Sequence, residues 1–431
     1  MIIETDQNIN HFITKTHQQS QSITANPTIM TTLNDIQTRI FAEKDHAVIH
    51  YTEKFDHVTL TPSEFKVSSA EIKKADQQVN TSLKQALTKA KHNIETFHRH
   101  QIPKNWSQSP QPGVTYGMRY TPIERVCLYV PGGLAPYPST VLMDAIPALL
   151  AGVKELIITT PPRQDGTIAP EILVAASLCG VTDIYKVGGA QAIFAVAYGT
   201  ESIPKVDKIV GPGNTYVNLA KQMVYGKVDI DKPAGPSDVL VIVEDSRYAP
   251  YAAAEMLAQL EHDPLAIATT LSTQKSVLTA IQAELNNQIQ TLSRQDIIKQ
   301  SLSNSALLLA KNQDQLIHYA NQIAAEHLVI LIDKYQSLFN AIHHAGAIFC
   351  GPYTPVTLGD YYAGPNHVLP TGGTARFASP LSVMDFMKHS THLNYDQGAL
   401  KAAQDSLQTL TEMEGFTAHY NAVQQRLNKS E

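Results

Sequence analysis

The alternation of short apolar segments with Ala-rich helical segments, which begins at residue 126, most constrains the fold of this chain. The first series contains the apolar segments VCLYV, ELIIT, DIYKV, KIV and SDVLVIV, with helical patterns between them. A second series after residue 250 contains AIATTLS, ALLLA, LVILI and AGAIFC. Strands that are apolar throughout and separated by helices are typical of parallel sheets covered on both faces. The pattern therefore predicts two α/β domains.

The regions that flank this alternation have other patterns. Residues 1–100 are polar with helical periodicity, and residues beyond 379 return to helical patterns and end in a polar tail. Residues 105–126 are rich in turn-forming residues and alternate in polarity near 115–120, which predicts a hairpin. At 431 residues the chain is too long for one compact core, so two or more domains are expected.

Composition and charge exclude several classes of function. The net charge is −6 and no dense run of Lys or Arg occurs, which disfavours nucleic-acid binding. The most apolar run is interrupted by Lys154 and Glu155, so no membrane span is expected. The first residues lack the pattern of a signal peptide, and Cys127, Cys179 and Cys350 form no Cys-x-x-Cys pair. These features predict a cytoplasmic enzyme with buried, reduced cysteines.

Three Gly-rich turns follow predicted strands, at residues 132–133, 188–189 and 211–214. Glycine lets the backbone approach a phosphate, and a following helix N-terminus favours its negative charge. No turn has the full G-x-G-x-x-G pattern, and any single one is better read as an ordinary strand-to-helix turn. Three turns within about eighty residues favour a nucleotide cleft.

Polar residues at unusual places suggest a second site. Gln259 and His262 are three apart in a predicted helix, so both side chains share one face. With Glu255, Glu261 and Asp263 beside them, that face is either a charged outer surface or a metal site. On spacing alone the metal site is the less favoured interpretation, because a single His on a helix is more often structural and Gln is an uncommon ligand.

Two further segments carry acids and bases. The loop at 351–380 holds Asp360 and His367 among glycines and prolines, and loops of this length inside α/β domains are usually functional. Glu326 and His327 stand where a helix gives way to an apolar strand. That junction could aim an acid and a base into a cleft, or the pair could cap the helix.

A last pair, Glu414 and His419, brackets the start of a helix near the C-terminus. Gln259, His262, Asp360 and His419 together would form a nitrogen and oxygen site that suits zinc. Their convergence cannot be derived from spacing. The residues by themselves therefore predict an α/β enzyme and leave the metal open.

Several segments, taken together and in order, resemble the histidinol dehydrogenase family. They span roughly residues 30–425 and read YVPGGLAPYPSTVLMDAIPA, VGGAQAIFAVAYGT, VDKIVGPGNTYVNLAK, PAGPSDVLV, LAQLEHDP, AAEHL, GDYYAGPNHVLPTGGTARFASPLSV and EGFTAHYNAV. Departures such as Leu134, Leu260 and Phe416 fall between the functional positions.

The resemblance implies two incomplete Rossmann-like domains with parallel sheets, plus helical N-terminal and C-terminal extensions. Residues 1–20 would form an N-terminal helical arm, and residues 128–240 an NAD-binding domain. Residues 21–127 and 241–380 would form the α/β domain that carries zinc and the catalytic residues. Residues 381–431 would form a helical tail that contributes to the partner subunit's site.

The resemblance also implies the reaction and its cofactors. The family oxidises L-histidinol through a bound L-histidinaldehyde to L-histidine in two hydride transfers, using NAD and one zinc ion per subunit, at the end of histidine biosynthesis. The implied zinc ligands are Gln259, His262, Asp360 and His419. The implied NAD contacts are Tyr129, Gln191 and Asn214.

Roles for other residues follow from the same resemblance. His327 would be the general base, since an imidazole suits proton transfer near neutrality, and Glu326 would activate the water that hydrates the aldehyde. Glu414 would bind the substrate imidazole, with Ser237 and His367 as further contacts. The complete implied substrate set is Ser237, Gln259, His262, His327, Asp360, His367, Glu414 and His419.

The C-terminal tail also predicts the oligomer. The tail is too short to form a core of its own and must pack on something. The family is dimeric, so the resemblance implies a homodimer in which Glu414 and His419 complete the other subunit's site. A tail that folds back on its own chain remains the alternative.

Three other functions compete with this interpretation. A related zinc- and NAD-dependent dehydrogenase could use another small polar alcohol, although Glu414 and His367 favour an imidazole. A zinc hydrolase could use Glu326 to activate water, but the Gly-rich turns speak against it. A non-catalytic binding protein with the same fold is disfavoured because every catalytic position carries the expected residue.

Overall fold

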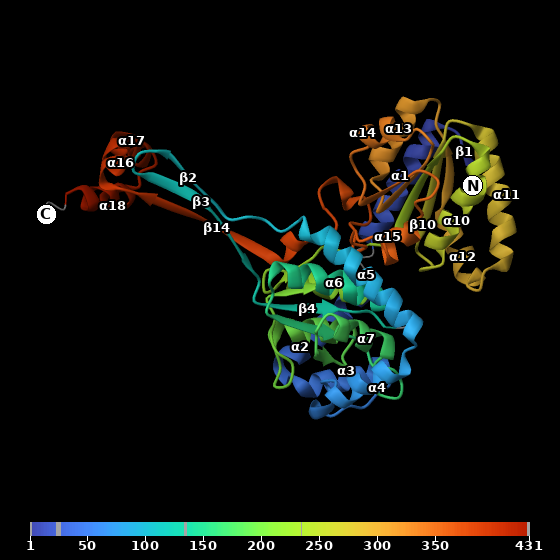
Figure 1. Ribbon diagram of the computed structural model, residues 1–431, viewed down its shortest axis with the longest axis horizontal. Coiled ribbons are helices and arrows are strands. Elements are labelled where there is room, and N and C mark those ends of the chain that lie inside the picture. The colour runs from blue at the N-terminus through green and yellow to red at the C-terminus, as the bar shows by residue number, and fades with distance from the viewer. Residues whose placement is uncertain (1, 23–26, 133–135, 234, 429–431) are drawn as a thin grey trace.

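The computed structural model describes residues 2–22, 27–132, 136–233 and 235–428. These residues form two α/β lobes and a long arm that projects from them (Figure 1). The predicted α/β class with two parallel sheets is confirmed. No described helix is both long enough and apolar enough to cross a bilayer. Cys127 and Cys179 are buried free thiols, and Cys350 is half-buried.

The first lobe contains a five-stranded sheet in which all neighbouring strands are parallel. Its strands, in spatial order, are β6 (Asp183–Tyr185), β5 (Glu155–Thr159), β4 (Arg125–Tyr129), β7 (Lys208–Val210) and β8 (Asp229–Ile230). The connecting helices are α6 (Pro138–Ala151), α7 (Pro170–Leu178), α8 (Gly189–Tyr198) and α9 (Thr215–Val224). This order, in which the first strand of the series lies at the centre, is that of a Rossmann-like domain.

Four N-terminal helices also belong to the first lobe. They are α2 (Pro27–Glu43), α3 (Asp45–Asp56), α4 (Ser69–Gln78) and α5 (Thr81–Arg99). Successive side chains of β4 point to opposite faces of the sheet. Leu33 in α2 shares a core with Cys127 on one face, and Ile94 in α5 shares a core with Leu128 on the other. The predicted grouping of residues 21–127 with 241–380 therefore differs from the observed packing.

This difference has a physical reason. The periodicity of the N-terminal helices shows that each has an apolar face, but such a face could cover either of the two sheets. Which sheet they cover is decided by contacts between residues that are distant in sequence. The helices α2 and α5 bury their apolar faces on the sheet that contains β4. The expected NAD-binding lobe is consequently larger than residues 128–240.

The second lobe contains a six-stranded parallel sheet. Its strands, in spatial order, are β1 (Ile2–Ile3), β11 (Ala306–Leu309), β10 (Ile267–Ser272), β9 (Asp238–Val243), β12 (His327–Leu331) and β13 (Ala347–Cys350). Its helices include α10 (Ala249–Leu260), α11 (Lys275–Gln288), α12 (Gln295–Ser301), α13 (Gln313–Ile323), α14 (Gln336–Ala341) and α15 (Val356–Tyr361). Apart from β1, the strand order repeats that of the first lobe.

The N-terminal helix α1 (Asp6–Ser22) packs on this second sheet. Ile9 and Ile13 share a core with Leu240 and Ile242 of β9, and β1 pairs with the edge strand β11. The segment predicted to be an N-terminal arm is helical as expected, but within this chain it completes the second lobe.

The arm combines the predicted hairpin with a strand from the C-terminal region. The hairpin strands are β2 (Trp106–Gln111) and β3 (Val114–Pro122), and β14 (Met387–Tyr395) pairs antiparallel with β3 over its whole length. Helices α16 (Gln397–Ala402), α17 (Gln404–Met413) and α18 (Thr417–Leu427) follow at the outer end of the arm (Figure 1). The tail predicted to be helical thus begins with a long strand. Because β14 is polar and exposed along its length, its sequence has no alternating apolar pattern to reveal it.

Candidate active site

A cluster of polar side chains lies at the amino ends of two central strands in the second sheet. Asp238 is the first residue of β9 and His327 the first residue of β12. Helices of a parallel α/β unit run back towards the strand starts. The end of α10 therefore brings Gln259 and His262 to this edge, and α15 brings Asp360.

His327 is the most enclosed base of the cluster, with 5% of its surface exposed. Its Nε2 atom lies 3.4 Å from Oδ1 of Asp360, and its Nδ1 atom lies 3.3 Å from the backbone oxygen of Asp238. Burial by itself would lower the pKa of His327, but the carboxylates of Glu326 and Asp360 raise it to about 9. The imidazole is therefore held between acidic groups on two sides.

Glu326 and Asp238 hold one another across the two strands. The backbone N–H of Asp238 donates to Oε2 of Glu326 at 3.0 Å, and the backbone N–H of Glu326 donates to Oδ1 of Asp238 at 2.9 Å. Burial raises the pKa of Glu326 to about 8 and that of Asp238 to about 6. A carboxyl with a pKa near neutrality can exchange a proton during a reaction.

Sequence reasoning missed Asp238. The available signal was an acid at the start of the apolar strand DVLVIV, next to Ser237, which was already a candidate. Ser237 is partly exposed and lies at the same edge, where its backbone oxygen accepts a hydrogen bond from Ile267. The structure thus adds a buried acid to the predicted pair Glu326 and His327.

His367 connects this cluster to the first lobe. Its Nδ1 atom lies 2.9 Å from the backbone oxygen of Asp360, and its Nε2 atom lies 3.5 Å from Oγ1 of Thr140 in α6. Beside it, the side chain of Asn366 donates to the backbone oxygen of Met143, also in α6. Burial lowers the pKa of His367, which favours a neutral imidazole. The cluster consequently faces the start of α6.

Gln259 and His262 differ in their surroundings. Helix α10 ends at Leu260, so His262 lies in the turn that follows, and its backbone N–H donates to the oxygen of Gln259. Gln259 is buried, whereas His262 is exposed. Displacement of water lowers the pKa of His262, and the Asp360 carboxylate acts in the opposite direction. His262 therefore lies within electrostatic range of the cluster, as the metal interpretation requires.

Glu414 and His419 are not part of this cluster within the chain. Both are exposed, Glu414 directly after α17 and His419 in α18, and the ring of His419 stacks on Phe416. Helices α17 and α18 lie at the outer end of the arm, far from the two lobes (Figure 1). Among the described residues, no three His, Cys, Asp or Glu side chains are close enough to hold a metal.

The donors that this chain does assemble fit zinc in their chemistry. Gln259, His262 and Asp360 supply the nitrogen and oxygen atoms that zinc accepts. The buried Nε2 atom of His327 faces Asp360 but has no hydrogen-bond partner among the described residues. The hydrogen-bonding capacity of the cluster is therefore not fully used. Four ligands are usual for zinc, so these three donors would leave one position of a zinc ion for a donor from elsewhere.

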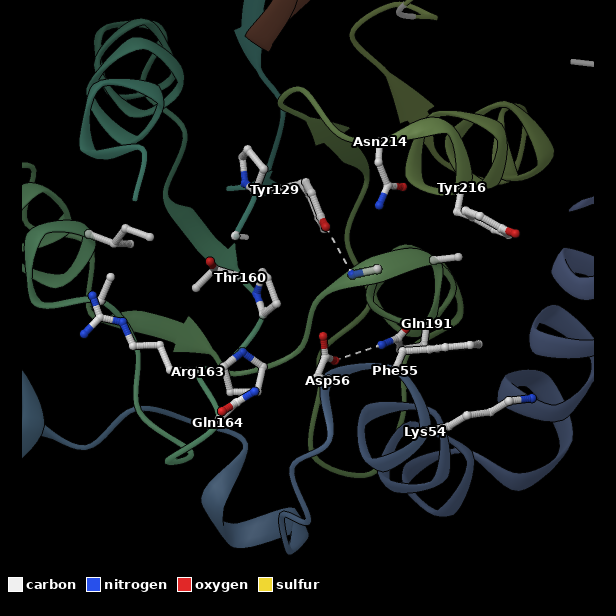
Figure 2. A pocket seen from close by; sticks show the side chains of 18 of the residues that line it. Lys54, Phe55, Asp56, Tyr129, Thr160, Arg163, Gln164, Gln191, Asn214 and Tyr216 are labelled. Carbon is white, nitrogen blue, oxygen red and sulfur yellow. Dashed lines mark hydrogen bonds between the residues drawn. The ribbon is translucent and has the colours of Figure 1, made fainter. Parts of the chain in front are cut away.

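A cavity of about 1280 Å³ opens at the carboxyl ends of the strands in the first sheet (Figure 2). Tyr129 ends β4 and accepts a hydrogen bond through its hydroxyl from the backbone N–H of Gly189 at 3.1 Å. The side chain of Gln191 donates to Oδ2 of Asp56 at 3.3 Å. Asn214 caps α9, since its Oδ1 accepts from the N–H of Val217. The three predicted cofactor residues thus line one cavity.

The cavity fits a dinucleotide in size and chemistry. It exceeds the volume of ordinary small-molecule pockets. Gly189, with φ +63°, begins the ten-residue helix α8, whose N-terminus suits an anionic group. The Oγ1 atom of Thr160 is buried at the cavity wall, and it has no hydrogen-bond partner in the part of the chain that the structure describes. Of the first Gly-rich turn, Gly132 lines the cavity, whereas Gly133 and the nearby Leu134 lie outside the described residues.

Comparisons with known proteins agree with this geometry. Residues 18–427 match the profile of the family described as histidinol dehydrogenase. The chain is 48% identical over 383 residues to the histidinol dehydrogenase of Oceanobacillus iheyensis, covering 89% of each chain. It is 46% identical over 405 residues to that of Lactococcus lactis, covering 94% of this chain and 93% of the relative.

A solved structure gives the same result in three dimensions. The crystal structure of histidinol dehydrogenase from Elizabethkingia anophelis has a TM-score of 0.89 and 39% sequence identity to this chain. The match covers 93% of this chain and 92% of that one. The family profile, the relatives and the shared fold all extend over most of the chain. The chain therefore belongs to the histidinol dehydrogenase family of oxidoreductases.

Proposed function

We propose that this enzyme is a zinc- and NAD-dependent histidinol dehydrogenase that oxidises L-histidinol through L-histidinaldehyde to L-histidine, the last step of histidine biosynthesis. The observation that carries the proposal is the buried His327, which lies between Asp360 and the pair Glu326 and Asp238. Family membership supports the substrate, and the cavity beside Tyr129 supports a dinucleotide cofactor.

Four residues would hold the zinc ion. Gln259, His262 and Asp360 would come from one chain, and His419 of the partner subunit would complete the site of a homodimer. When bound, zinc would orient the substrate's imidazole and amino nitrogens, and NAD would accept the hydride. The exposed position of His419 on a projecting arm supports this arrangement, because the arm lies away from its own cluster (Figure 1).

His327 would accept the proton of the substrate hydroxyl as the hydride leaves the same carbon. A base must be neutral before it accepts a proton, and the neighbouring carboxylates favour the protonated imidazole. Coordination of Asp360 would reduce the negative charge that reaches His327 and bring its pKa closer to neutrality. Enclosure of the imidazole would also exclude bulk water from the transfer.

Glu326 would act in the second half of the reaction. The aldehyde must add water before a second hydride can leave, and Glu326 would accept the proton of that water. Its raised pKa makes it a stronger base once ionised than an exposed carboxylate. The hydrogen bonds with Asp238 would keep Glu326 at the start of β12 through both steps.

The remaining polar residues would define the substrate. Ser237 and His367 lie at the same edge of the second lobe as His327 and would contact the bound molecule. The partner subunit's Glu414 would bind the substrate imidazole. A related dehydrogenase for another small polar alcohol is the second candidate, because this scaffold would serve any alcohol that the pocket admits.

Product stoichiometry tests the proposal. The enzyme is incubated with zinc, NAD and L-histidinol, and NADH is counted per histidine formed. A ratio of two is expected. A ratio near one, or no histidine, would contradict the two-step reaction, and the same assay with other amino alcohols would test the second candidate. The His343→Ala variant changes an exposed histidine that is not among the proposed ligands, and it serves as a control for the loss of a histidine.

A further inference from the structure

One carboxylate in the dinucleotide cavity comes from outside the strand-and-helix units that build it. Asp56 is the last residue of α3, and its side chain points into the cavity (Figure 2). Its Oδ2 atom accepts the hydrogen bond from Gln191, at the first turn of α8. Asp56 is therefore held in a fixed position against a residue that the proposed function assigns to NAD.

The position of Asp56 relative to the reaction centre decides which part of a bound dinucleotide it contacts. Pro136 lines the cavity and lies just before α6, whose Thr140 contacts His367 of the reaction centre. Thr32 in α2 and Asp56 in α3 also line the cavity, and these two helices lie on the side of the first lobe that faces away from the second lobe (Figure 1).

The nicotinamide ring must reach the substrate carbon beside His327, because hydride passes directly between the two. The nicotinamide half therefore lies towards Pro136 and α6. The adenosine half of the same molecule must then lie towards α2 and α3, where Asp56 is located.

We propose that Asp56 recognises the adenosine ribose and sets the cofactor preference of this enzyme, accepting a hydrogen bond from a ribose hydroxyl and excluding the 2′-phosphate of NADP. The inference rests on the proposed NAD dependence and adds the residue that would discriminate between the two dinucleotides. A carboxylate has two acceptor oxygens, so Asp56 can hold Gln191 with one and a hydroxyl with the other.

The negative charge of Asp56 would discriminate between NAD and NADP. A 2′-phosphate carries negative charge and acceptor oxygens only, so beside a carboxylate it is repelled and finds no donor. Burial raises the pKa of Asp56 to about 6, which leaves the side chain mainly ionised at neutral pH. The same partial burial keeps water away from Asp56. Water therefore screens the repulsion between the carboxylate and a 2′-phosphate less effectively than it would at an exposed site.

Two cations that line the cavity, Lys54 and Arg163, have partners other than Asp56. Nη2 of Arg163 lies 3.7 Å from Oε2 of Glu171 in α7. The ammonium of Lys54 lies over the ring of Phe55 and extends away from Asp56 (Figure 2). In Figure 2 neither cationic group therefore points towards Asp56.

Direct binding tests the proposal without relying on turnover. Dissociation constants of NADH and NADPH are measured by fluorescence titration for the wild-type enzyme, for Asp56→Asn and for Glu53→Gln. Glu53 lies on the same helix, is exposed and does not line the cavity, so its variant carries the same change of charge at a neighbouring site. The ratio of kcat/KM for NAD and NADP with L-histidinol is measured in parallel.

The wild-type enzyme and Glu53→Gln should bind NADH about 100-fold more tightly than NADPH, since like charges at close range are strongly disfavoured. Asp56→Asn should reduce that preference at least about tenfold, mainly by tighter binding of NADPH. A preference in Asp56→Asn within about twofold of the wild-type value, or an equal change in Glu53→Gln, would overturn the proposal.

The experiment also distinguishes failure of the proposed NAD dependence from failure of the role assigned to Asp56. If the wild-type enzyme binds neither dinucleotide, the proposed NAD dependence fails and the role of Asp56 fails with it. If it binds NADH but Asp56→Asn leaves the preference unchanged, only the role of Asp56 fails. Circular dichroism establishes that each variant is folded, and Asp56→Ser replaces Asp56→Asn if the latter does not fold.

Discussion

The Nε2 atom of His327, at the start of β12, lies 3.4 Å from Oδ1 of Asp360 in α15. The proposed base and a proposed zinc ligand thus share a contact, and each affects the charge of the other. Asp360 helps to raise the pKa of His327, and His327 helps to hold the pKa of Asp360 below its ordinary value against the opposing effect of burial. Coordination of Asp360 by the proposed zinc ion would therefore alter the protonation of His327.

His327 and Glu326 should separate the two oxidations. His327→Ala should slow both steps at least about 100-fold, because a base is needed each time a hydride leaves. Glu326→Gln, which keeps a hydrogen-bond acceptor for the backbone of Asp238, should slow oxidation of the aldehyde by a similar factor and that of the alcohol by less than about tenfold. Single-turnover assays that start from the alcohol and from the aldehyde measure the steps separately. Equal slowing of both steps by Glu326→Gln would contradict the assigned roles.

His262→Ala should remove zinc and activity while the fold survives. The side chain is exposed at the end of α10, so its removal leaves no internal cavity. A large domain does not depend on one metal for folding as a zinc finger does. Zinc content measured by atomic absorption should fall to background, and the circular dichroism spectrum should not change. His343→Ala should keep its zinc, and an unchanged zinc content in His262→Ala would rule out this ligand.

The projecting arm should complete the site of a second subunit. Inactive His262→Ala and His419→Ala dimers are unfolded together and refolded with zinc. In a mixed dimer with shared sites, one site carries both changes and the other carries neither, so activity should return to about a quarter of the wild-type value after random assortment. If each site is built within one chain, no activity returns although mixed dimers form.

Cofactor preference should depend on pH through Asp56. The raised pKa of about 6 means that the carboxyl is neutral below this pH and charged above it. Its repulsion of a 2′-phosphate is therefore lost in acid, and the preference for NADH over NADPH should increase as the pH rises through about 6. Because the phosphate also titrates, the same titration of Asp56→Asn supplies the control. A pH dependence of equal size in that variant would exclude Asp56 as its cause.

A buried ion pair beneath the third Gly-rich turn should be required for stability. The ammonium of Lys221 contacts Asp231, both side chains are almost fully buried, and Lys221 also donates to the backbone oxygen of Gly211 at 2.8 Å. Lys221→Met would leave the Asp231 carboxylate buried without its cation, at a cost of about 3–5 kcal/mol. The melting temperature should fall by about 10 °C.

The matched controls for this change are an exposed lysine and a neutralised partner. Lys227→Met, at an exposed position in the turn after α9, should leave the melting temperature within about 2 °C of the wild-type value. Lys221→Met combined with Asp231→Asn should recover part of the loss, since the uncompensated charge is then absent. No difference between Lys221→Met and Lys227→Met would show that the pair contributes little.

The strands of both sheets were predictable because they are buried on both faces and therefore apolar throughout. The segments around Leu128 and Val241 are examples, and both lie at the centre of their sheets. The pair Glu326 and His327 was also detectable, because polar residues next to an apolar strand break a local pattern. Strand β14 had no such signal, since its side chains face solvent along the arm.

The sequence by itself determined the α/β class, the alternation of strands and helices between residues 126 and 350, and the chemical character of the candidate residues, because periodicity and residue type are local properties. Only the tertiary structure decided that α2 and α5 cover the first sheet and that Asp238 holds Glu326. It also decided that Asp56 reaches Gln191, and that α18, which contains His419, lies far from α10 in the same chain (Figure 1). Each of these relationships joins residues distant in sequence. They depend on which apolar faces and which hydrogen-bonding groups meet when the chain folds, and no local pattern encodes that choice.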